Sequence, residues 1–409
     1  MSPSTTQPLF APQRASSSHS DERAAAEDDA LLGGQSKGSS PRSKPTLWRE
    51  AAVFIWALLA TAAVIVLAVL LTEHGASHDK TSRPTKRNLI FMVSDGMGPA
   101  SLSLTRSFRQ YERGLLYDDV LSLDQHFIGS SRTRSNSSLV TDSAAGATAF
   151  SCGKKSYNGA ISMLPDHTPC GTVLEAAKRK GYLTGLVVTT DITDATPACF
   201  SAHQRMRTGE DSIASQQIGE HPLGMRVVDL MFGGGRCHFL PNSTQNSCRN
   251  DDRDILKLAR ESYGWNYISN REQFDALDSG NAVELPILGL FSDIDFPFEL
   301  DRRNMNETYP SLDEMSRTAL RALEEATRDS DQGFFLMIEG SRIDHAGHGN
   351  DPAAQVHEVL AYDRAFSSVI EFLENSDVEG IVISTSDHET GGLSVARRKF
   401  TPDMILVHS

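Results

Sequence analysis

Two patterns of apolar residues divide this chain. Residues 51–71 form an apolar run that contains no charged side chain. From residue 88 onward, short apolar runs rich in β-branched and aromatic residues alternate with longer stretches of helical periodicity. The short runs predict strands and the periodic stretches predict helices. The predicted strands are 89–93, 183–190, 227–232, 334–338 and 381–384, and the predicted helices are 171–180, 254–263, 312–328 and 352–373.

The larger part of the chain, residues 88–409, is predicted to fold around one sheet. Its predicted strands are apolar along almost their whole length, which is typical of strands covered by helices on both faces. Strands that alternate with helices also favour parallel pairing. We therefore predict an α/β fold with a doubly wound, mostly parallel central sheet and helices on both faces.

The first part of the chain is predicted to anchor it in a membrane. About 20 apolar residues cross a bilayer as a helix, so residues 51–71 are predicted to be a transmembrane helix. A cleavable signal peptide would lie nearer the N-terminus and have a shorter apolar region, which favours an uncleaved signal anchor. Residues 1–50 are rich in Ser, Pro, Gly and charge and are predicted to be a disordered tail, with residues 72–87 as a stalk.

The orientation of this anchor is indicated by features that follow it. Basic residues flank the apolar run on both sides, so the positive-inside rule does not decide the orientation of the helix in the membrane. All five cysteines follow the run, as do glycosylation sequons at Asn136, Asn242 and Asn306. Cys237 and Cys248 flank a loop rich in Pro, Asn and Ser, and we predict a disulfide between them. The sequence thus predicts a single-pass type II protein with its larger part in an oxidising lumen and its tail in the cytosol.

Two further features concern partners. Residues 27–32 resemble an acidic dileucine sorting signal, which predicts that an adaptor complex binds Leu31 and Leu32, although such hexamers also arise by chance in polar tails. The net charge is −14, which argues against a nucleic-acid-binding surface because phosphate backbones require clustered Lys and Arg.

Acidic residues follow four of the predicted strands. In an open parallel sheet, sites form beyond the carboxyl ends of strands. Each acidic residue alone is explained by the polarity of loops, but several at one sheet edge would repel one another unless cations are present. These residues are Asp95, Asp191 and Asp194, Glu339, and Asp387 next to His388.

The densest group of candidate ligands lies between residues 339 and 348. It contains Glu339, Asp344, His345 and His348 directly after an apolar run. Carboxylate oxygen and imidazole nitrogen are the usual ligands of zinc, so this segment predicts a metal site, with a solvated loop as the alternative.

Ser143 is the candidate nucleophile. It follows Asp142 and precedes a run of small residues, which indicates a helix that another part of the chain approaches closely. A serine in the first helical turn lies in the positive end of the helix dipole, beside free backbone N–H groups. Ser143 as an ordinary N-cap is the alternative. The sequence around it offers no histidine as a base, but a metal ion could activate its hydroxyl.

Five motifs follow one another between residue 88 and the end of the chain: Asp95-Gly-Met-Gly98, Thr141-Asp-Ser-Ala-Ala145, Thr193-Asp-Ala-Thr-Pro197, Glu339-Gly-Ser-Arg-Ile-Asp344 and Asp387-His-Glu-Thr-Gly391. Taken in this order, they resemble the motifs of the alkaline phosphatase family. The anchored layout with a dileucine tail resembles the fungal vacuolar branch of that family, which implies a vacuolar membrane location. The family also implies a homodimer.

The resemblance implies hydrolysis of phosphate monoesters through a phosphoserine at Ser143, with two zinc ions and one magnesium ion. Asp344 and His348 would bind the first zinc. The second zinc would be bound by Asp95, Asp387 and His388.

The resemblance also implies residues around the magnesium and the phosphate. Asp95, Thr196 and Glu339 would bind magnesium, with Asp194 beside it. Arg207 would bind the phosphate, and Asp142 would orient the Arg207 side chain. Arg205 is the local alternative, and the spacing from Asp194 favours Arg207.

One ligand expected from the resemblance has no clear counterpart. The first zinc should receive a third ligand from a histidine well downstream of His388, and His408 is the sole candidate. We therefore expect residues 88–409 to be an alkaline phosphatase domain that is incomplete at its C-terminus. The alternative function is a membrane-anchored pseudoenzyme that binds phosphate without turnover.

Overall fold

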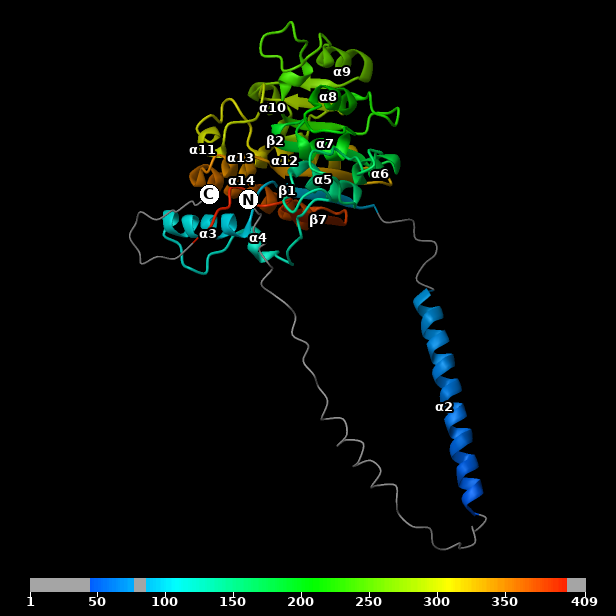
Figure 1. Cartoon of the computed structure of the whole chain (residues 1–409). Helices are drawn as coiled ribbons and strands as arrows, with labels where there is room; N and C mark the ends of the chain where they lie inside the picture. Colours follow the sequence, from blue (N-terminus) through cyan, green and yellow to red (C-terminus); the bar gives the residue numbers. More distant parts are fainter. Residues whose placement is uncertain (1–44, 77–85, 396–409) are drawn as a thin grey trace, which may run out of the picture. The chain divides into compact units, whose positions relative to one another are not determined.

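The structure is a computed structural model that describes residues 45–76 and 86–395. The chain separates into two units, residues 1–82 and 83–409, which are described in turn. In the first unit, helix α2 spans Pro45–Ala76 (Figure 1). Its segment Trp48–Ala68 has a mean hydropathy of 2.6 and is long and apolar enough to cross a membrane. The predicted dileucine signal, most of the predicted stalk and His408 lie outside the described residues.

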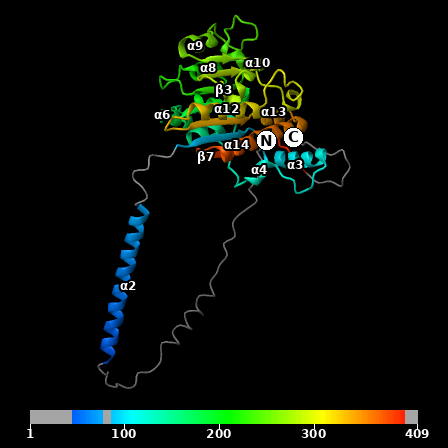
Figure 2. The same cartoon turned by 180° about the vertical axis from the view of Figure 1, so that it is seen from behind.

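The second unit is built on a seven-stranded sheet with the order β4-β5-β3-β2-β6-β1-β7 (Figures 1 and 2). Every pairing between these strands is parallel, which confirms the predicted fold class. The strands are β1 Asn88–Ser94, β2 Leu183–Asp191, β3 Leu230–Gly234, β4 Asn266–Ile268, β5 Ile287–Leu290, β6 Phe334–Gly340 and β7 Gly380–Thr385.

The sequence pattern missed two strands and misplaced the start of a third. β4 and β5 are short and follow breaks in the apolar pattern, so they carry little periodic signal. β3 begins at Leu230 although Val227 and Val228 are buried and apolar. The carbonyl of Val227 accepts a hydrogen bond from the side chain of Thr184 at 2.6 Å, so this position is bonded to a hydroxyl and not to the strand ladder.

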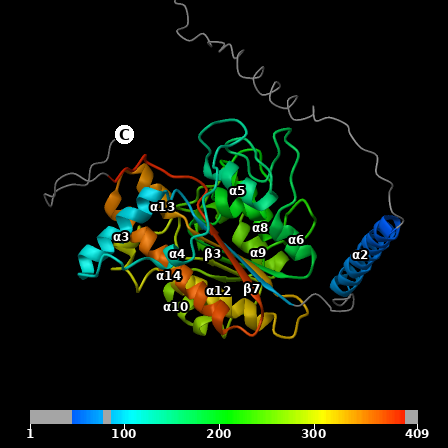
Figure 3. The same cartoon turned by 90° about the horizontal axis from the view of Figure 1, so that it is seen from below.

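Helices cover both faces of the sheet. In Figure 3, α3, α12 and α14 lie on one side of the strands, and α5, α6, α8 and α9 lie on the other. Several helices begin at residues that satisfy their free N–H groups; for example, Ser311 and Glu314 form a capping box at the start of α12. The helices are α3 Pro99–Arg113, α4 Ser122–Gln125, α5 Ser143–Cys152, α6 Val173–Arg179, α7 Ala195–Ser201, α8 Glu210–Ile218, α9 Ile255–Tyr263, α10 Arg271–Asp275, α11 Glu299–Arg302, α12 Leu312–Ala326, α13 Arg342–His348 and α14 Pro352–Asn375.

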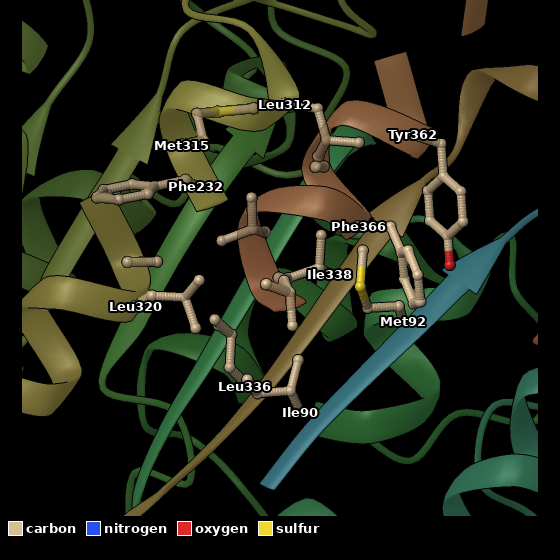
Figure 4. Close-up of a cluster of buried hydrophobic side chains, with 14 of the residues drawn as sticks. Ile90, Met92, Phe232, Leu312, Met315, Leu320, Leu336, Ile338, Tyr362 and Phe366 are labelled. Atoms are coloured by element: carbon tan, nitrogen blue, oxygen red, sulfur yellow. The ribbon is translucent and has the colours of Figure 1, made fainter. Parts of the chain in front are cut away.

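The buried side chains of β6 show why its sequence is apolar throughout. Leu336 and Ile338 point into the core beneath α12 and α14 (Figure 4), whereas Phe335 and Met337 point into the core on the opposite face. Alternate residues of a strand point to opposite faces, so a strand covered on both faces buries all of them.

Two disulfides stabilise loops of this unit. Cys237–Cys248 confirms the pairing predicted from sequence. Cys152–Cys170 was not predicted, because its cysteines stand in no distinctive loop pattern. Cys199 is buried and free.

Truncation of a buried side chain on β6 tests this description of the core. Leu336 is fully buried, so Leu336→Ala is expected to lower the free energy of unfolding by about 2–5 kcal/mol through lost burial and a residual cavity. Leu116→Ala is the control, because Leu116 is 73% exposed and its truncation should change stability by less than about 0.5 kcal/mol. Denaturant unfolding of both variants measures the difference, and equal midpoints would contradict the assigned core.

Candidate active site

The acidic residues singled out in the sequence gather at one edge of the sheet. Asp95 follows β1, Asp194 follows β2, Glu339 lies near the end of β6 and Asp387 follows β7. These four strands are consecutive in the sheet order β2-β6-β1-β7. Parallel pairing therefore brings their carboxyl ends, and the acidic side chains on them, to the same place.

Ser143 lies at the start of α5 and faces this edge. Asp142 is the N-cap, and its Oδ1 accepts a hydrogen bond from the N–H of Ala145 at 2.9 Å. Ser143 Oγ lies 3.3 Å from Asp95 Oδ1 and 3.2 Å from His388 Nε2. The fold thus places a histidine beside Ser143, although no histidine lies near it in the sequence.

The small residues of α5 allow this approach. A Cβ added at Gly146 would lie 3.0 Å from the Cβ of Asp387, so a larger residue there would push the segment after β7 away from the helix. This explains the run of small residues after Ser143.

Asp95, Asp344 and His388 form the centre of the candidate site, and one ligand atom from each lies within 4.8 Å of the others. His388 Nε2 is 3.6 Å from Asp95 Oδ1 and 3.2 Å from Asp387 Oδ2. Asp387 Oδ1 accepts the N–H of Gly96 at 3.1 Å, whereas its buried Oδ2 has no hydrogen-bond partner among the described residues.

Burial and mutual repulsion make these carboxylates difficult to ionise. Burial, followed by the charges of Asp387 and Asp344, raises the pKa of Asp95 well above its ordinary value. Burial and the charge of Asp95 raise the pKa of Glu339 in the same way. Burial raises the pKa of Asp387 to about 7, and the charge of Glu339 contributes. A bound cation would remove this penalty, because it replaces repulsion by attraction.

The hydrogen bonds of His388 fit a metal ligand. The hydroxyl of Thr390 donates to Asp344 Oδ1 at 2.5 Å, which leaves its oxygen free to accept from His388 Nδ1 at 3.1 Å. On the opposite side of the ring, His388 Nε2 faces the oxygens of Asp95 and Asp387, so an imidazole nitrogen and carboxylate oxygens converge on one point. Together with the orphaned Asp387 Oδ2, the donor set fits a divalent cation. Thr390 was overlooked in the sequence, although it lies inside one of the five motifs.

The remaining predicted metal ligands lie on either side of this centre. His348 Nε2 is 3.4 Å from Asp344 Oδ2, and its side chain is 71% exposed, so it lies at the rim of the site. On the other side, Thr196 Oγ1 is 3.4 Å from Asp95 Oδ2. Glu339 Oε2 accepts from the hydroxyl of Ser341 at 2.7 Å. Hard oxygen ligands of this kind suit magnesium.

Arg207 contacts two carboxylates, one of them on Asp142, the residue before Ser143. Its guanidinium lies 2.7 Å from Asp194 Oδ1 and 3.8 Å from Asp142 Oδ2. Burial opposes its charge, but Asp194 more than offsets this and raises the pKa of Arg207. Arg205, the alternative, is exposed, and its backbone carbonyl accepts from the hydroxyl of Tyr157.

His345 contacts Asp295, a partner that the sequence pattern did not indicate. Its Nδ1 lies 3.2 Å from Asp295 Oδ2. Burial opposes protonation of His345, but Asp295 raises its pKa above the ordinary value. Asp295 lies in a loop after β5, a strand without a clear sequence signal, which is why the pairing was missed.

Comparisons with known proteins identify relatives of this chain. The alkaline phosphatase family profile matches residues 86–406. The chain is 54% identical to the repressible alkaline phosphatase of Saccharomyces cerevisiae over 91% of its length and 66% of that protein. It is 50% identical to an alkaline phosphatase of Schizosaccharomyces pombe over 91% of its length and 68% of that protein. The solved structure of Thermus thermophilus alkaline phosphatase matches with a TM-score of 0.65 and 32% identity, covering 79% of this chain and 65% of that one.

The chain thus spans about two thirds of the length of the curated yeast relatives. The family profile covers nearly the whole sheet-containing unit, and the structural match covers 79% of the chain. This chain therefore belongs to the alkaline phosphatase family.

Proposed function

We propose that this protein hydrolyses phosphate monoesters and that Ser143 is the nucleophile. The observation that carries this proposal is the position of the buried Ser143 Oγ, within 3.3 Å of both Asp95 and His388 at the start of a helix. The family membership supports the same reaction class. Ser143 Oγ would attack phosphorus and release the alcohol, and water would then hydrolyse the phosphoserine.

The chain's own residues supply much of what phosphoryl transfer needs. The reaction depends chiefly on positioning and on neutralising the oxygens of the transferred group. Ser143 and Ala144 lie in the first turn of α5, where backbone N–H groups have no partner within the helix and the helix dipole would favour the negative charge of a phosphoryl group. Arg207 offers two parallel N–H donors on a half-buried guanidinium that Asp194 and Asp142 hold in place.

We propose that Asp344 and His348 hold one zinc ion and that Asp95, Asp387 and His388 hold a second. Bound cations of this kind neutralise phosphoryl oxygens and acidify a coordinated hydroxyl or water.

We propose a magnesium site at Thr196 and Glu339, shared with Asp95 and bordered by Asp194. The solved structure of a His-to-Asp mutant of TAB5 alkaline phosphatase, 31% identical to this chain, contains magnesium bound in its M3 site, which supports the proposal of magnesium binding here.

We also propose a type II protein anchored in the vacuolar membrane, with the catalytic unit in the lumen. The apolar helix α2 precedes that unit. The two disulfides favour an oxidising compartment, and Asn136, Asn242 and Asn306 are exposed as glycosylation requires. The proposed homodimer and adaptor binding at Leu31-Leu32 rest on sequence alone.

Removal of the proposed nucleophile is the first test. Ser143→Ala is expected to lower the turnover of p-nitrophenyl phosphate by on the order of 10³-fold or more, because no hydroxyl remains to attack phosphorus. Acid quenching during turnover should trap phosphoserine in the wild-type protein and none in the variant. Ser330→Ala, at an exposed serine, should behave as wild type. Near-normal turnover of Ser143→Ala would refute the assignment, and phosphate binding without any wild-type turnover would favour the pseudoenzyme.

A second test separates the two arginines. Arg207→Lys keeps the positive charge but loses the bidentate grip, so the KM and the inhibition constant of inorganic phosphate should each rise roughly tenfold. Arg205→Lys is the matched control and should leave both constants unchanged, since the Arg205 side chain is exposed. Steady-state kinetics with phosphate as inhibitor measures both, and the reverse pattern would assign the role to Arg205.

A further inference from the structure

A second group of buried titratable side chains lies apart from the carboxylates of the candidate active site. Glu175 lies on α6, His203 lies between α7 and α8, and His221 follows α8. Glu175 Oε1 is 2.7 Å from His203 Nε2 and 3.0 Å from His221 Nε2, and the three side chains are 4%, 8% and 0% exposed. Burying charged groups is costly unless they are paired, so this cluster needs a structural or functional reason.

The hydrogen bonds of His203 show that it is an imidazolium. Its Nδ1 lies 3.0 Å from the carbonyl oxygen of Ser162, which can only accept. Its Nε2 faces the carboxylate of Glu175, which also accepts. Both nitrogens therefore carry protons, and His203 and Glu175 form a buried ion pair. In agreement, burial opposes the charge of His203 but Glu175 raises its pKa, and the pKa of Glu175 falls to about 2 although burial acts against this.

His221 is the third member of the cluster. The N–H of Leu223 donates to His221 Nδ1 at 3.2 Å, and His221 Nε2 lies 3.0 Å from Glu175 Oε1, although Nε2 has no hydrogen-bond partner among the described residues. A metal ion among these three residues would require the lone pairs of both Nε2 atoms, and His221 would then lose its contact with Leu223. The arrangement favours a proton and not a metal as the shared cation.

His203 belongs to the same short segment as Arg207. Gln204 and Ile161 form an antiparallel bridge through two backbone hydrogen bonds of 3.0 Å, and the N–H of Arg207 donates to the carbonyl of Gly159 at 2.8 Å. Residues 159–162 and 203–207 thus form a narrow ribbon. The side chain of His203 links its two strands through the carbonyl of Ser162.

The ribbon is fixed at both ends. At one end, the N–H of Gly159 donates to Asp142 Oδ2 at 2.8 Å, and Asp142 caps the helix that begins with Ser143. At the other end, Ser162 has a φ of 45°, a left-handed conformation that a serine keeps only when its surroundings determine it. The contact between His203 Nδ1 and the Ser162 carbonyl is one of the interactions that keep Ser162 in this conformation. The ion pair with Glu175 in turn fixes the position of His203.

We propose that Glu175, His203 and His221 form a positioning cluster that sets the place of Arg207 relative to Ser143, and so the affinity of the site for the phosphoryl group. This inference rests on the proposed function. None of the three side chains contacts the phosphoryl site itself. They act through the ribbon, which carries Arg207 at one end and meets Asp142 on the nucleophile helix.

The test is Glu175→Gln in the full chain. The substitution removes the negative charge that keeps His203 doubly protonated. His203 can then no longer donate both to the side chain at position 175 and to the carbonyl of Ser162. The KM for p-nitrophenyl phosphate and the inhibition constant of inorganic phosphate should each rise roughly tenfold, within the factor of about 100 that a 1 Å misplacement can cost. The rise in melting temperature caused by inorganic phosphate should shrink accordingly. The kcat should change much less.

A double-mutant cycle separates positioning from general destabilisation. In an Arg207→Ala background, Glu175→Gln should produce no further loss of phosphate affinity, because the cluster acts through Arg207. The same loss in both backgrounds, or unchanged phosphate affinity in the single variant, would overturn the inference. Glu325→Gln, the same substitution at an exposed site, should have no effect.

Two further outcomes are distinguishable. If Glu175→Gln does not fold, His203→Gln decides the question, because a glutamine can reach either Glu175 or Ser162 but not both, and it should lose phosphate affinity to a similar degree. Unchanged affinity in that variant would overturn the inference. A wild-type protein that neither hydrolyses p-nitrophenyl phosphate nor binds phosphate would refute the proposed function, whereas an active wild type with an unaffected Glu175→Gln refutes only the positioning cluster.

Discussion

The structure depends on how it accommodates several carboxylates at one edge of its sheet. Parallel pairing of β2, β6, β1 and β7 brings Asp95, Glu339 and Asp387 together in a buried place, where burial and repulsion disfavour their ionised forms. Such an arrangement persists at neutral pH if protons or metal cations compensate the charge. His388 Nε2 lies among the same oxygens, and an imidazole nitrogen together with carboxylate oxygens is a ligand set that divalent cations prefer, which favours metal cations. Ser143 lies beside these carboxylates, so a cation that compensates their charge would also be placed to activate the Ser143 hydroxyl.

A second layer of interactions holds the residues that face the phosphoryl site. Arg207 contacts Asp194 and Asp142, and Asp142 also caps the helix of Ser143 and accepts the N–H of Gly159. One carboxylate therefore connects the proposed nucleophile, the proposed phosphate clamp and the ribbon behind them. These contacts fix the positions of the three groups relative to one another, which suits a reaction that depends mainly on positioning.

The sequence predicted those features that depend on local pattern and missed those that depend on distant pairing. The apolar strands, the acidic strand ends and the run of small residues after Ser143 are visible in short windows, and they were sufficient for the fold class and for most of the candidate site. The contact between Ser143 and His388 joins residues 245 positions apart, and only the family resemblance indicated that they share a site, since no local pattern reveals it. The same holds for the Glu175–His203 ion pair, which joins α6 to the segment between α7 and α8. β4 and β5 were missed because short strands carry little periodicity.

The most direct test of the account is the pH dependence of stability with and without metal. The folded-state pKa values of Asp95, Glu339 and Asp387 are raised, so the metal-free folded protein binds more protons than the unfolded chain between about pH 4 and pH 7, and its stability should fall as pH rises through that range. Melting temperatures after chelation should therefore drop between pH 5.5 and pH 8, and zinc with magnesium should restore stability most strongly at pH 8. A chelated protein that is equally stable at both pH values, and that added metal does not stabilise, would contradict the claim that cations hold this sheet edge together.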